Sequence, residues 1–300
     1  MKKILVVGGT GFIGKHLVKH CVKKNFYTFS LSSKKVNKKN KIKKARYIIL
    51  DIRNKKNIKK LKKIKFDVVV NLGGEVNHRL KKKVIDTHYH GLVNLLNNIN
   101  LDYLKSFIQI GSSAEYGKFD KRHKKQREMH PCFPRSYYGK AKLSATKYLI
   151  NNKKFNSFSK CVLRLYQVYG PQQKENRIIP FVIKNSLANK FFPCSYGLQT
   201  RDFAYISDVI SAIFKSISHP KKVDGQIINI GFGKGYKLVY VIKKILSLIG
   251  RGKPLYGKVK MRSDEAKKVV PDILKAKKIL NWYPKVDLEK GLRLTINSFK

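Results

Sequence analysis

Residues 4–14 read Ile-Leu-Val-Val-Gly-Gly-Thr-Gly-Phe-Ile-Gly, a short apolar run followed by closely spaced glycines. The apolar run is typical of a buried strand, and the pattern from Phe12 to Val22 is typical of a helix. Glycines permit a tight turn between the two, and a helix N-terminus offers free N–H groups to a pyrophosphate. The stretch therefore matches the Gly-x-Gly-x-x-Gly dinucleotide fingerprint, and the expected contacts come from Gly8, Gly11, Phe12, Ile13 and Gly14.

The same alternation of strand and helix continues through the first half of the chain. Buried-strand patterns occur at Ile4–Val7, Tyr27–Leu31, Arg46–Leu50, Phe66–Val70, Phe107–Ile110 and Cys161–Leu165. Strands separated by helix-length segments predict an α/β fold, a Rossmann-like doubly wound parallel sheet. Helical patterns dominate after Pro171. We expect a Rossmann domain over residues 1–168 and a smaller, mainly helical substrate-binding domain over residues 169–300, with some interleaving of the chain.

The charge of the chain is strongly positive. Lys and Arg total 67 of the 300 residues against 17 Asp and Glu, which gives a net charge of +50. Only 12 of the basic residues are Arg, and the lysines are spread over the whole chain. Because base reading relies mainly on arginine forks, this pattern argues against a nucleic-acid partner. The positive potential would instead steer small polyanions such as a dinucleotide or a sugar nucleotide.

Cysteines and hydropathy indicate the compartment. Four cysteines show no paired spacing, so they are interpreted as reduced thiols. No stretch approaches eighteen consecutive apolar residues, which predicts that nothing is inserted into a membrane. A cytoplasmic location is the resulting expectation.

The end of the second predicted strand bears on the choice of cofactor. An acidic residue about twenty positions after the glycines would bind the ribose 2′-hydroxyl of NAD. This chain has Ser32, Ser33 and Lys34 there, which can receive a 2′-phosphate. NADP(H) is therefore favoured, with NAD(H) as the alternative. After the third strand, Asp51 and Ile52 are placed to border the adenine.

Tyr138 and Lys142 lie four residues apart, on one face of a predicted helix, where an ammonium could lower the pKa of a phenol. Chance alone predicts about three such Tyr-x-x-x-Lys pairs in so lysine-rich a chain. Three are present, the others being Tyr240/Lys244 and Tyr256/Lys260. Only the first pair lies between the fifth and sixth predicted strands and follows the polar turn at residues 111–117, where open α/β sheets bind ligands. Position, and not spacing, singles out Tyr138 and Lys142.

Several further motifs extend this pattern. They are the turn Ser112-Ser113-Ala114-Glu115-Tyr116-Gly117, the segment Pro134 to Lys142, the run Arg164 to Pro171, and Gln199-x-Arg201-Asp202-Phe203-x-Tyr205. Together with the glycine loop, they resemble the extended short-chain dehydrogenase/reductases that epimerise, dehydrate or reduce nucleotide sugars. The resemblance covers nearly the whole chain. Within that family, residues 175–180 and the Arg201 segment are most similar to the CDP-abequose synthase-like 4-ketosugar reductases.

This resemblance implies roles for individual residues. Tyr138 would be the acid/base on the sugar oxygen, Lys142 would hold the nicotinamide ribose, and Ser112, with Ser113 as the alternative, would bond to the same oxygen. Gly73 and Gly74 would border the nicotinamide. Residues implied to bind a nucleotide-diphosphate sugar are Gln167, Arg177, Arg201 and Arg262. The resemblance requires no metal and implies a homodimer formed through helices near residues 84–99 and 137–152.

Some positions depart from the family pattern. Gln167 and His88 stand where asparagine is common, and Gly73-Gly74 replaces an alanine pair. Dehydratases of the family carry an acidic residue one or two places after the catalytic hydroxyl, but Glu115 comes one step later. Dehydration is therefore disfavoured.

Three functions remain open on the sequence. We expect reduction of a nucleotide-linked 4-keto-6-deoxy sugar, with a 4-epimerase that keeps NAD bound as the alternative. A more distant alternative is a Rossmann-fold protein that binds RNA or a partner without catalysis.

Overall fold

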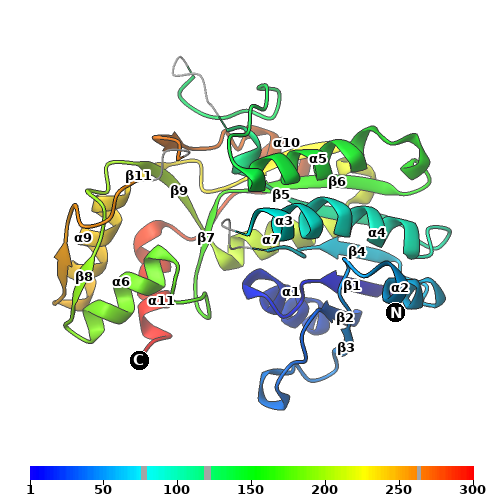
Figure 1. Ribbon diagram of the computed structural model, residues 1–300, viewed down its shortest axis with the longest axis horizontal. Coiled ribbons are helices and arrows are strands. Elements are labelled where there is room, and N and C mark those ends of the chain that lie inside the picture. Colours follow the sequence, from blue (N-terminus) through cyan, green and yellow to red (C-terminus); the bar gives the residue numbers. More distant parts are fainter. Residues whose placement is uncertain (76–79, 118–122, 262–264) are drawn as a thin grey trace.

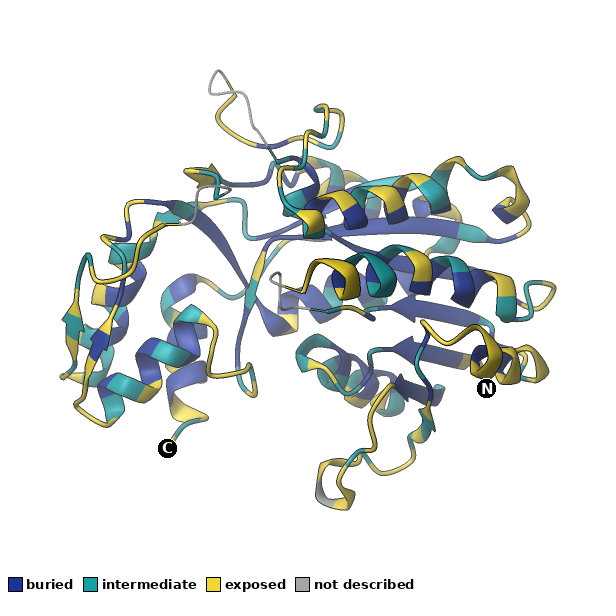
Figure 2. Ribbon diagram, in the orientation of Figure 1, coloured by how far each residue is buried: buried dark blue, intermediate teal, exposed yellow. Residues whose placement is uncertain are grey.

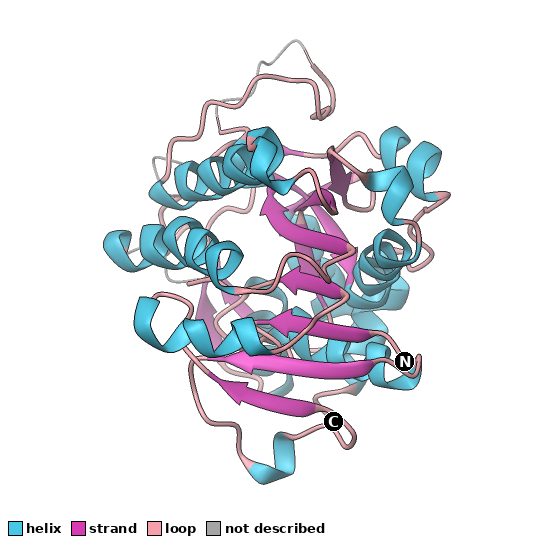
Figure 3. Ribbon diagram, turned by 90° about the vertical axis from the view of Figure 1, so that its right-hand side faces the viewer, coloured by secondary structure: helices cyan, strands magenta, loops and turns pink. Residues whose placement is uncertain are grey.

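The chain builds one large parallel sheet that is covered by helices on both faces (Figures 1 and 3). In this computed structural model, the described residues are 1–75, 80–117, 123–261 and 265–300. The seven strands lie in the order β10-β6-β5-β4-β1-β2-β3, with every neighbouring pair parallel. Their bounds are β1 Lys3–Val7, β2 Tyr27–Ser32, β3 Arg46–Ile49, β4 Val68–Asn71, β5 Ser106–Ser112, β6 Ser159–Leu165 and β10 Gln226–Ile230.

Alternate residues of the central strands enter two separate hydrophobic cores. Ile4 and Val6 of β1 pack in the cluster that contains Leu17 of the first helix, whereas Leu5 and Val7 pack in the cluster that contains Leu92. Because both faces are covered, these strands are continuous apolar runs rather than alternating ones. Figure 2 shows the resulting buried centre of the sheet.

Two sets of helices supply this cover. On one face lie α1 (Phe12–Lys23), α7 (Ile206–Ser218), α8 (Pro220–Val223) and α10 (Leu274–Leu280). On the other lie α2 (Lys55–Ile58), α3 (Lys81–Ile85), the π-helical turn η3 (Asp86–His90), α4 (Gly91–Asn98) and α5 (Tyr137–Asn151). Single 3₁₀ turns are η1 Lys38–Asn40, η2 Lys59–Lys63, η4 Ser113–Glu115 and η5 Lys153–Phe155.

A second group of elements lies beyond the carboxyl ends of these strands (Figure 1). Strand β9 (Thr200–Tyr205) pairs with β7 (Gln167–Tyr169), β11 (Gly235–Lys237) and β13 (Lys268–Val269), and β8 (Phe191–Pro193) pairs with β12 (Lys253–Leu255). Three helices, α6 (Ile178–Leu187), α9 (Leu238–Ile249) and α11 (Leu288–Asn297), complete the group. Strand β10 and helices α7, α8 and α10 lie after residue 168 yet pack with the large sheet.

The expected doubly wound parallel sheet is confirmed. The predicted division at residue 168 remains a prediction. The second half holds more strands than its sequence pattern indicated. Strands β7, β8 and β11 to β13 are only two or three residues long, and the longer strands β9 and β10 were also not predicted. Among the described residues, no helix is long and apolar enough to cross a membrane.

Candidate active site

The glycine loop between β1 and α1 forms a close-packed backbone cradle. Gly8 has φ +74°, and a Cβ on Gly14 would lie 2.2 Å from the carbonyl oxygen of Gly8. Gly11 is the N-cap of α1, and neither a side-chain cap nor an acidic residue in the first turn, which starts with Phe12 and Ile13, occupies the helix N-terminus. Glycine is required where the chain packs this tightly, and a free helix N-terminus suits a pyrophosphate. The cradle therefore fits the dinucleotide that the sequence predicts.

The carboxyl end of β2 is polar and partly exposed. Ser32 is buried and its Oγ donates to the carbonyl oxygen of Lys34 at 2.8 Å, while the residues Ser33 and Lys34 are exposed. No carboxylate stands at residues 32–35. The segment lies beside the glycine loop, because Gly8 N donates a hydrogen bond to Leu31 O at 2.8 Å.

The next two strands contribute Asp51, Ile52 and Gly73. Asp51 forms an ion pair with Arg53 (2.5 Å), and the hydrogen bond from Arg53 lowers the pKa of this carboxyl. Ile52 is buried, and its Cδ1 lies 3.2 Å from the position of a Cβ on Gly73. The residues that follow β3 and β4 thus meet beside the glycine loop, and their contacts with the adenine and the nicotinamide stay predictions.

Ser112, Tyr138 and Lys142 are brought together at the carboxyl end of β5. Ser112 ends β5, and α5 begins one residue before Tyr138, capped by Ser136, whose Oγ accepts from Gly139 N at 3.0 Å. The Tyr138 hydroxyl shares a hydrogen bond with the Ser112 side chain. Lys142 is 4 % exposed, and its Nζ lies 5.9 Å from the centre of the Tyr138 ring. Ser112 is therefore in contact with Tyr138, and the choice between Ser112 and Ser113 as the catalytic serine stays a prediction.

The acid–base properties of the pair differ from the expectation. Burial raises the pKa of the Tyr138 phenol, and the hydrogen bond with Ser112 opposes this rise. Burial lowers the pKa of the Lys142 amine to about 8. The Lys142 Nζ donates to the carbonyl oxygen of Ile110 at 2.7 Å. The expected lowering of the phenol's pKa by Lys142 is thus wrong for this structure, because desolvation is the larger effect and the amine bonds to the backbone.

A contact that the sequence analysis missed joins Gly74, His88 and Tyr138. A Cβ on Gly74 would lie 2.1 Å from Cε1 of His88. The His88 ring in turn packs edge-on against the Tyr138 ring, with centroids 5.0 Å apart. His88 lies in the π-helical turn η3, a feature common at functional sites. The two departures from the family pattern, glycine at 74 and histidine at 88, are therefore one packing arrangement.

Glu115 is the second group that the sequence analysis did not place. Its carboxylate is fully buried and accepts from Ser112 N (2.8 Å), Thr146 Oγ1 (2.9 Å) and Arg164 Nε (2.9 Å). Ser112 and Glu115 form a capping box around η4. A buried ion pair therefore lies directly behind the serine that contacts Tyr138.

The four residues expected to bind the substrate are placed differently from one another. Gln167 on β7 and Arg177 before α6 are exposed, and the charge of Arg177 acts on the Tyr138 phenol. Arg201 on β9 is 7 % exposed and forms an ion pair with Glu265 at 2.5 Å. Arg262 lies outside the described residues. Of these residues, Arg177 is thus within electrostatic range of Tyr138, and Arg201 is bound to a carboxylate of the chain.

Comparisons with known proteins agree with this geometry. A "Putative UDP-glucose 4-epimerase" of Methanocaldococcus jannaschii is 31 % identical, over 99 % of this chain and 98 % of that protein. The CDP-abequose synthase of Salmonella muenchen is 26 % identical, over 97 % of this chain and 96 % of that protein.

Among solved structures, the UDP-glucose 4-epimerase of Thermotoga maritima with UDP-glucose superposes with a TM-score of 0.92 at 26 % identity, covering 99 % of this chain and 98 % of that one. Residues 4–231 match the model of the NAD dependent epimerase/dehydratase family. The chain is thus an enzyme of the NAD dependent epimerase/dehydratase family, within the extended short-chain dehydrogenase/reductases.

Proposed function

We propose that this enzyme reduces a nucleotide-linked 4-keto-6-deoxy sugar and prefers NADP(H) to NAD(H). The observation that carries the reaction type is the cluster of Ser112, Tyr138 and Lys142 at the carboxyl end of β5. The observation that favours NADP(H) is the end of β2, where Ser32, Ser33 and Lys34 offer hydroxyls and a positive charge instead of a carboxylate. A 2′-phosphate would be repelled by a carboxylate and attracted by this segment.

In this proposal, different residues transfer the proton and bind the substrate and the cofactor. A nicotinamide cofactor supplies the hydride. Tyr138 donates a proton to the sugar oxygen, and Ser112 holds that oxygen through its hydroxyl. The raised pKa of the phenol keeps Tyr138 protonated near neutral pH, as a proton donor in reduction must be. Lys142 holds the ribose beside Tyr138, and the glycine cradle from Gly8 to Gly14 holds the pyrophosphate.

The geometry also disfavours dehydration. Glu115 is the acidic residue nearest in sequence to Ser112, but its carboxylate is bound by Arg164, Thr146 and the Ser112 backbone. The oxygens of this carboxylate are thus held by the chain and are not free to act on the sugar.

A nucleotide-sugar 4-epimerase is the second candidate. It is favoured by the M. jannaschii relative and by the T. maritima structure, both of which carry that name. The same three residues would serve it, because epimerisation also moves a hydride and a proton at one sugar carbon. The two candidates differ in whether the cofactor is consumed.

The test separates the candidates by cofactor balance. Purified protein is incubated with a 4-keto sugar nucleotide and either NADPH or NADH, and oxidation of the cofactor is followed. We expect NADPH to be consumed, and Tyr138→Phe to lower kcat about a hundredfold or more while still binding NADPH. Interconversion of two sugar nucleotides without added cofactor would overturn the reductase assignment in favour of the epimerase. Mass spectrometry of nucleotides that co-purify with the protein would identify the base and the sugar.

Two structural proposals accompany the function. We propose that Gln167, Arg177, Arg201 and Arg262 contact the nucleotide-sugar, and that Arg201 exchanges Glu265 for the diphosphate. We also propose a homodimer formed through the helices at residues 84–99 and 137–152.

A further inference from the structure

The turn that holds Ser112 is fixed by a buried carboxylate rather than by backbone hydrogen bonds alone. Glu115 Oε1 accepts from Ser112 N at 2.8 Å, and Glu115 Oε2 accepts from Thr146 Oγ1 and Arg164 Nε, each at 2.9 Å. Thr146 is on α5, the helix that also carries Tyr138 and Lys142. One carboxylate therefore connects the end of β5, the catalytic helix and β6.

The backbone makes room for this carboxylate at one position. Gly111 precedes Ser112 on β5, and a Cβ there would lie 2.6 Å from Glu115 Oε1. In the sheet, Gly111 pairs with Arg164 of β6, which puts the guanidinium beside the turn. The glycine, the carboxylate and the arginine thus fit one another across two strands.

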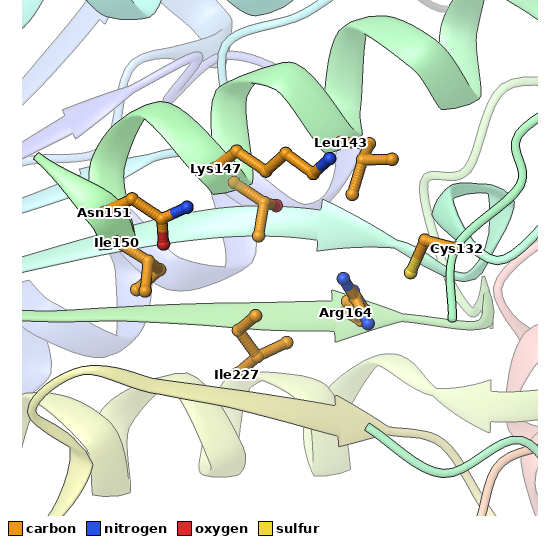
Figure 4. Close-up of a pocket in the computed structure, with 8 residues that line it drawn as sticks. Cys132, Leu143, Lys147, Ile150, Asn151, Arg164 and Ile227 are labelled. Atoms are coloured by element: carbon orange, nitrogen blue, oxygen red, sulfur yellow. The ribbon is translucent and has the colours of Figure 1, made fainter. Parts of the chain in front are cut away.

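The positive charge of the buried Arg164 guanidinium is neutralised by the Glu115 carboxylate. The Arg164 side chain is 3 % exposed, and its Cζ lies over the Tyr116 ring, 4.7 Å from the ring centre. Its Nη1 is buried and has no hydrogen-bond partner among the described residues. Arg164 also borders a pocket of about 230 Å³ between α5 and the outer strands (Figure 4). In Figure 4 the labelled residues around Arg164 are Cys132, Leu143, Lys147, Ile150, Asn151 and Ile227, none of them acidic.

The charge of Glu115 also reaches both catalytic residues. It raises the pKa of the Lys142 amine and that of the Tyr138 phenol. The other titratable side chains close to it are Arg164 and Cys132. Since Glu115, Lys142 and Arg164 are buried, the interactions among them are poorly screened by solvent.

We propose that Glu115 is a positioning residue, which fixes the Ser112 turn through its carboxylate and ties that turn to the helix of Tyr138 and Lys142. Arg164 is its buried counter-ion. Glu115 itself does not touch the substrate. This inference rests on the proposed function for its effect on turnover, but its effect on Lys142 does not require any substrate.

The test uses three variants. Glu115→Gln removes the charge but keeps the shape. Because this change leaves Arg164 charged and unpaired in the interior, it is strongly destabilising, and the double variant Glu115→Gln/Arg164→Met removes both charges together. Asp208→Asn is the matched control, because Asp208 is also a buried carboxylate, accepting from Lys285 N (3.0 Å) and Val286 N (2.9 Å), and lies away from Ser112 on α7.

The first readout is the titration of Lys142, followed by nuclear magnetic resonance of side-chain-labelled lysine and assigned by the loss of its signal in Lys142→Met. The pKa of Lys142, about 8 in the parent protein, should move to lower pH in Glu115→Gln, because the carboxylate that raises it is gone while the Arg164 cation remains. Asp208→Asn should leave the titration unchanged. An unchanged titration in folded Glu115→Gln would overturn the proposal, and the double variant is used for the turnover measurement.

The second readout is turnover. We expect kcat to fall about tenfold to a hundredfold in the double variant with KM for the sugar nucleotide nearly unchanged, since a small misplacement of a reacting group has an effect of this size. A folded double variant with the parent kcat would mean that Glu115 only neutralises Arg164, and the positioning role would be wrong. If the parent protein turns over no sugar nucleotide, the proposed function fails, while the Lys142 titration still decides the role of Glu115.

Discussion

Two places on the same edge of the sheet differ sharply in how they hold their polar groups. At the end of β5, the side chains of Glu115, Lys142 and Arg164 are all buried and bonded to fixed partners. At the end of β2, Ser33 and Lys34 are exposed. A substitution at the end of β5 therefore changes packing and geometry, whereas one at the end of β2 acts mainly through charge.

The packing around Tyr138 offers the largest test of this difference. Gly74→Ala places a methyl group 2.1 Å from the His88 ring, which must move against Tyr138. We expect kcat to fall about a hundredfold. Adding His88→Asn should restore kcat to within about tenfold of the parent, because the smaller side chain leaves space for the methyl group. Steady-state kinetics and melting temperatures of the two single variants and the double variant provide the check, and a double variant no better than Gly74→Ala would contradict the coupling.

The cofactor end should respond to charge alone. Ser33→Asp places a carboxylate at an exposed position of the segment where a 2′-phosphate is proposed to bind, and we expect the Kd for NADPH to rise about tenfold to a hundredfold while that for NADH falls or stays constant. Fluorescence titration of both nucleotides measures the effect without any substrate. Ser218→Asp adds the same charge at an exposed position at the end of α7 and should change neither Kd. Equal weakening of both nucleotides would show that the segment does not distinguish them.

The smallest expected effect is on stability and comes from Lys142. Its pKa is lowered from 10.5 to about 8 by burial. Below about pH 8 the amine is protonated in the folded and unfolded chains alike, so the cost of burying the charge is fully present. Between about pH 8 and 10.5 the folded chain has lost this proton while the unfolded chain still binds it, so stability rises with pH.

Lys142→Met should therefore be more stable than the parent at pH 7, by at most about 3 kcal/mol, and the difference should shrink towards pH 10.5. Denaturant unfolding of both proteins at several pH values measures it. A difference that is constant with pH would contradict a buried, charged Lys142. The same variant should lose activity, because Lys142 is proposed to hold the cofactor.

The sequence predicted more of the large sheet than of the contacts within the candidate site. Six of the seven strands of the large sheet and the glycine loop are local patterns of apolar periodicity and glycine spacing, so they were predicted to within two residues at each end, whereas β10 was not predicted. The bounds of the helix that carries Tyr138 and Lys142 were implied by the family resemblance. The Glu115–Arg164 pair joins residues 49 positions apart and depends on the register of β5 and β6, which no local pattern shows.

His88 illustrates the same limit in another way. The sequence marked both His88 and Gly74 as unusual, but only the structure relates them, through a π-helical turn that brings the ring above Gly74 and against Tyr138. The raised pKa of Tyr138 was missed for a similar reason, because the spacing of two residues carries no information on burial.

The late position of β10 in the chain affects how the protein can be made. Strand β10 lies at the edge of the large sheet and pairs with β6. In the chain, however, β6 and β10 are separated by residues 167–205, which belong to the second group of elements. During synthesis, one edge of β6 therefore stays unpaired, and the core beneath it stays uncovered, until residues 206–230 have emerged. Unpaired strand edges favour association with other chains. A fragment that ends at residue 168 should accordingly aggregate rather than bind a dinucleotide. We therefore expect that the first half of this enzyme does not fold as an independent nucleotide-binding domain.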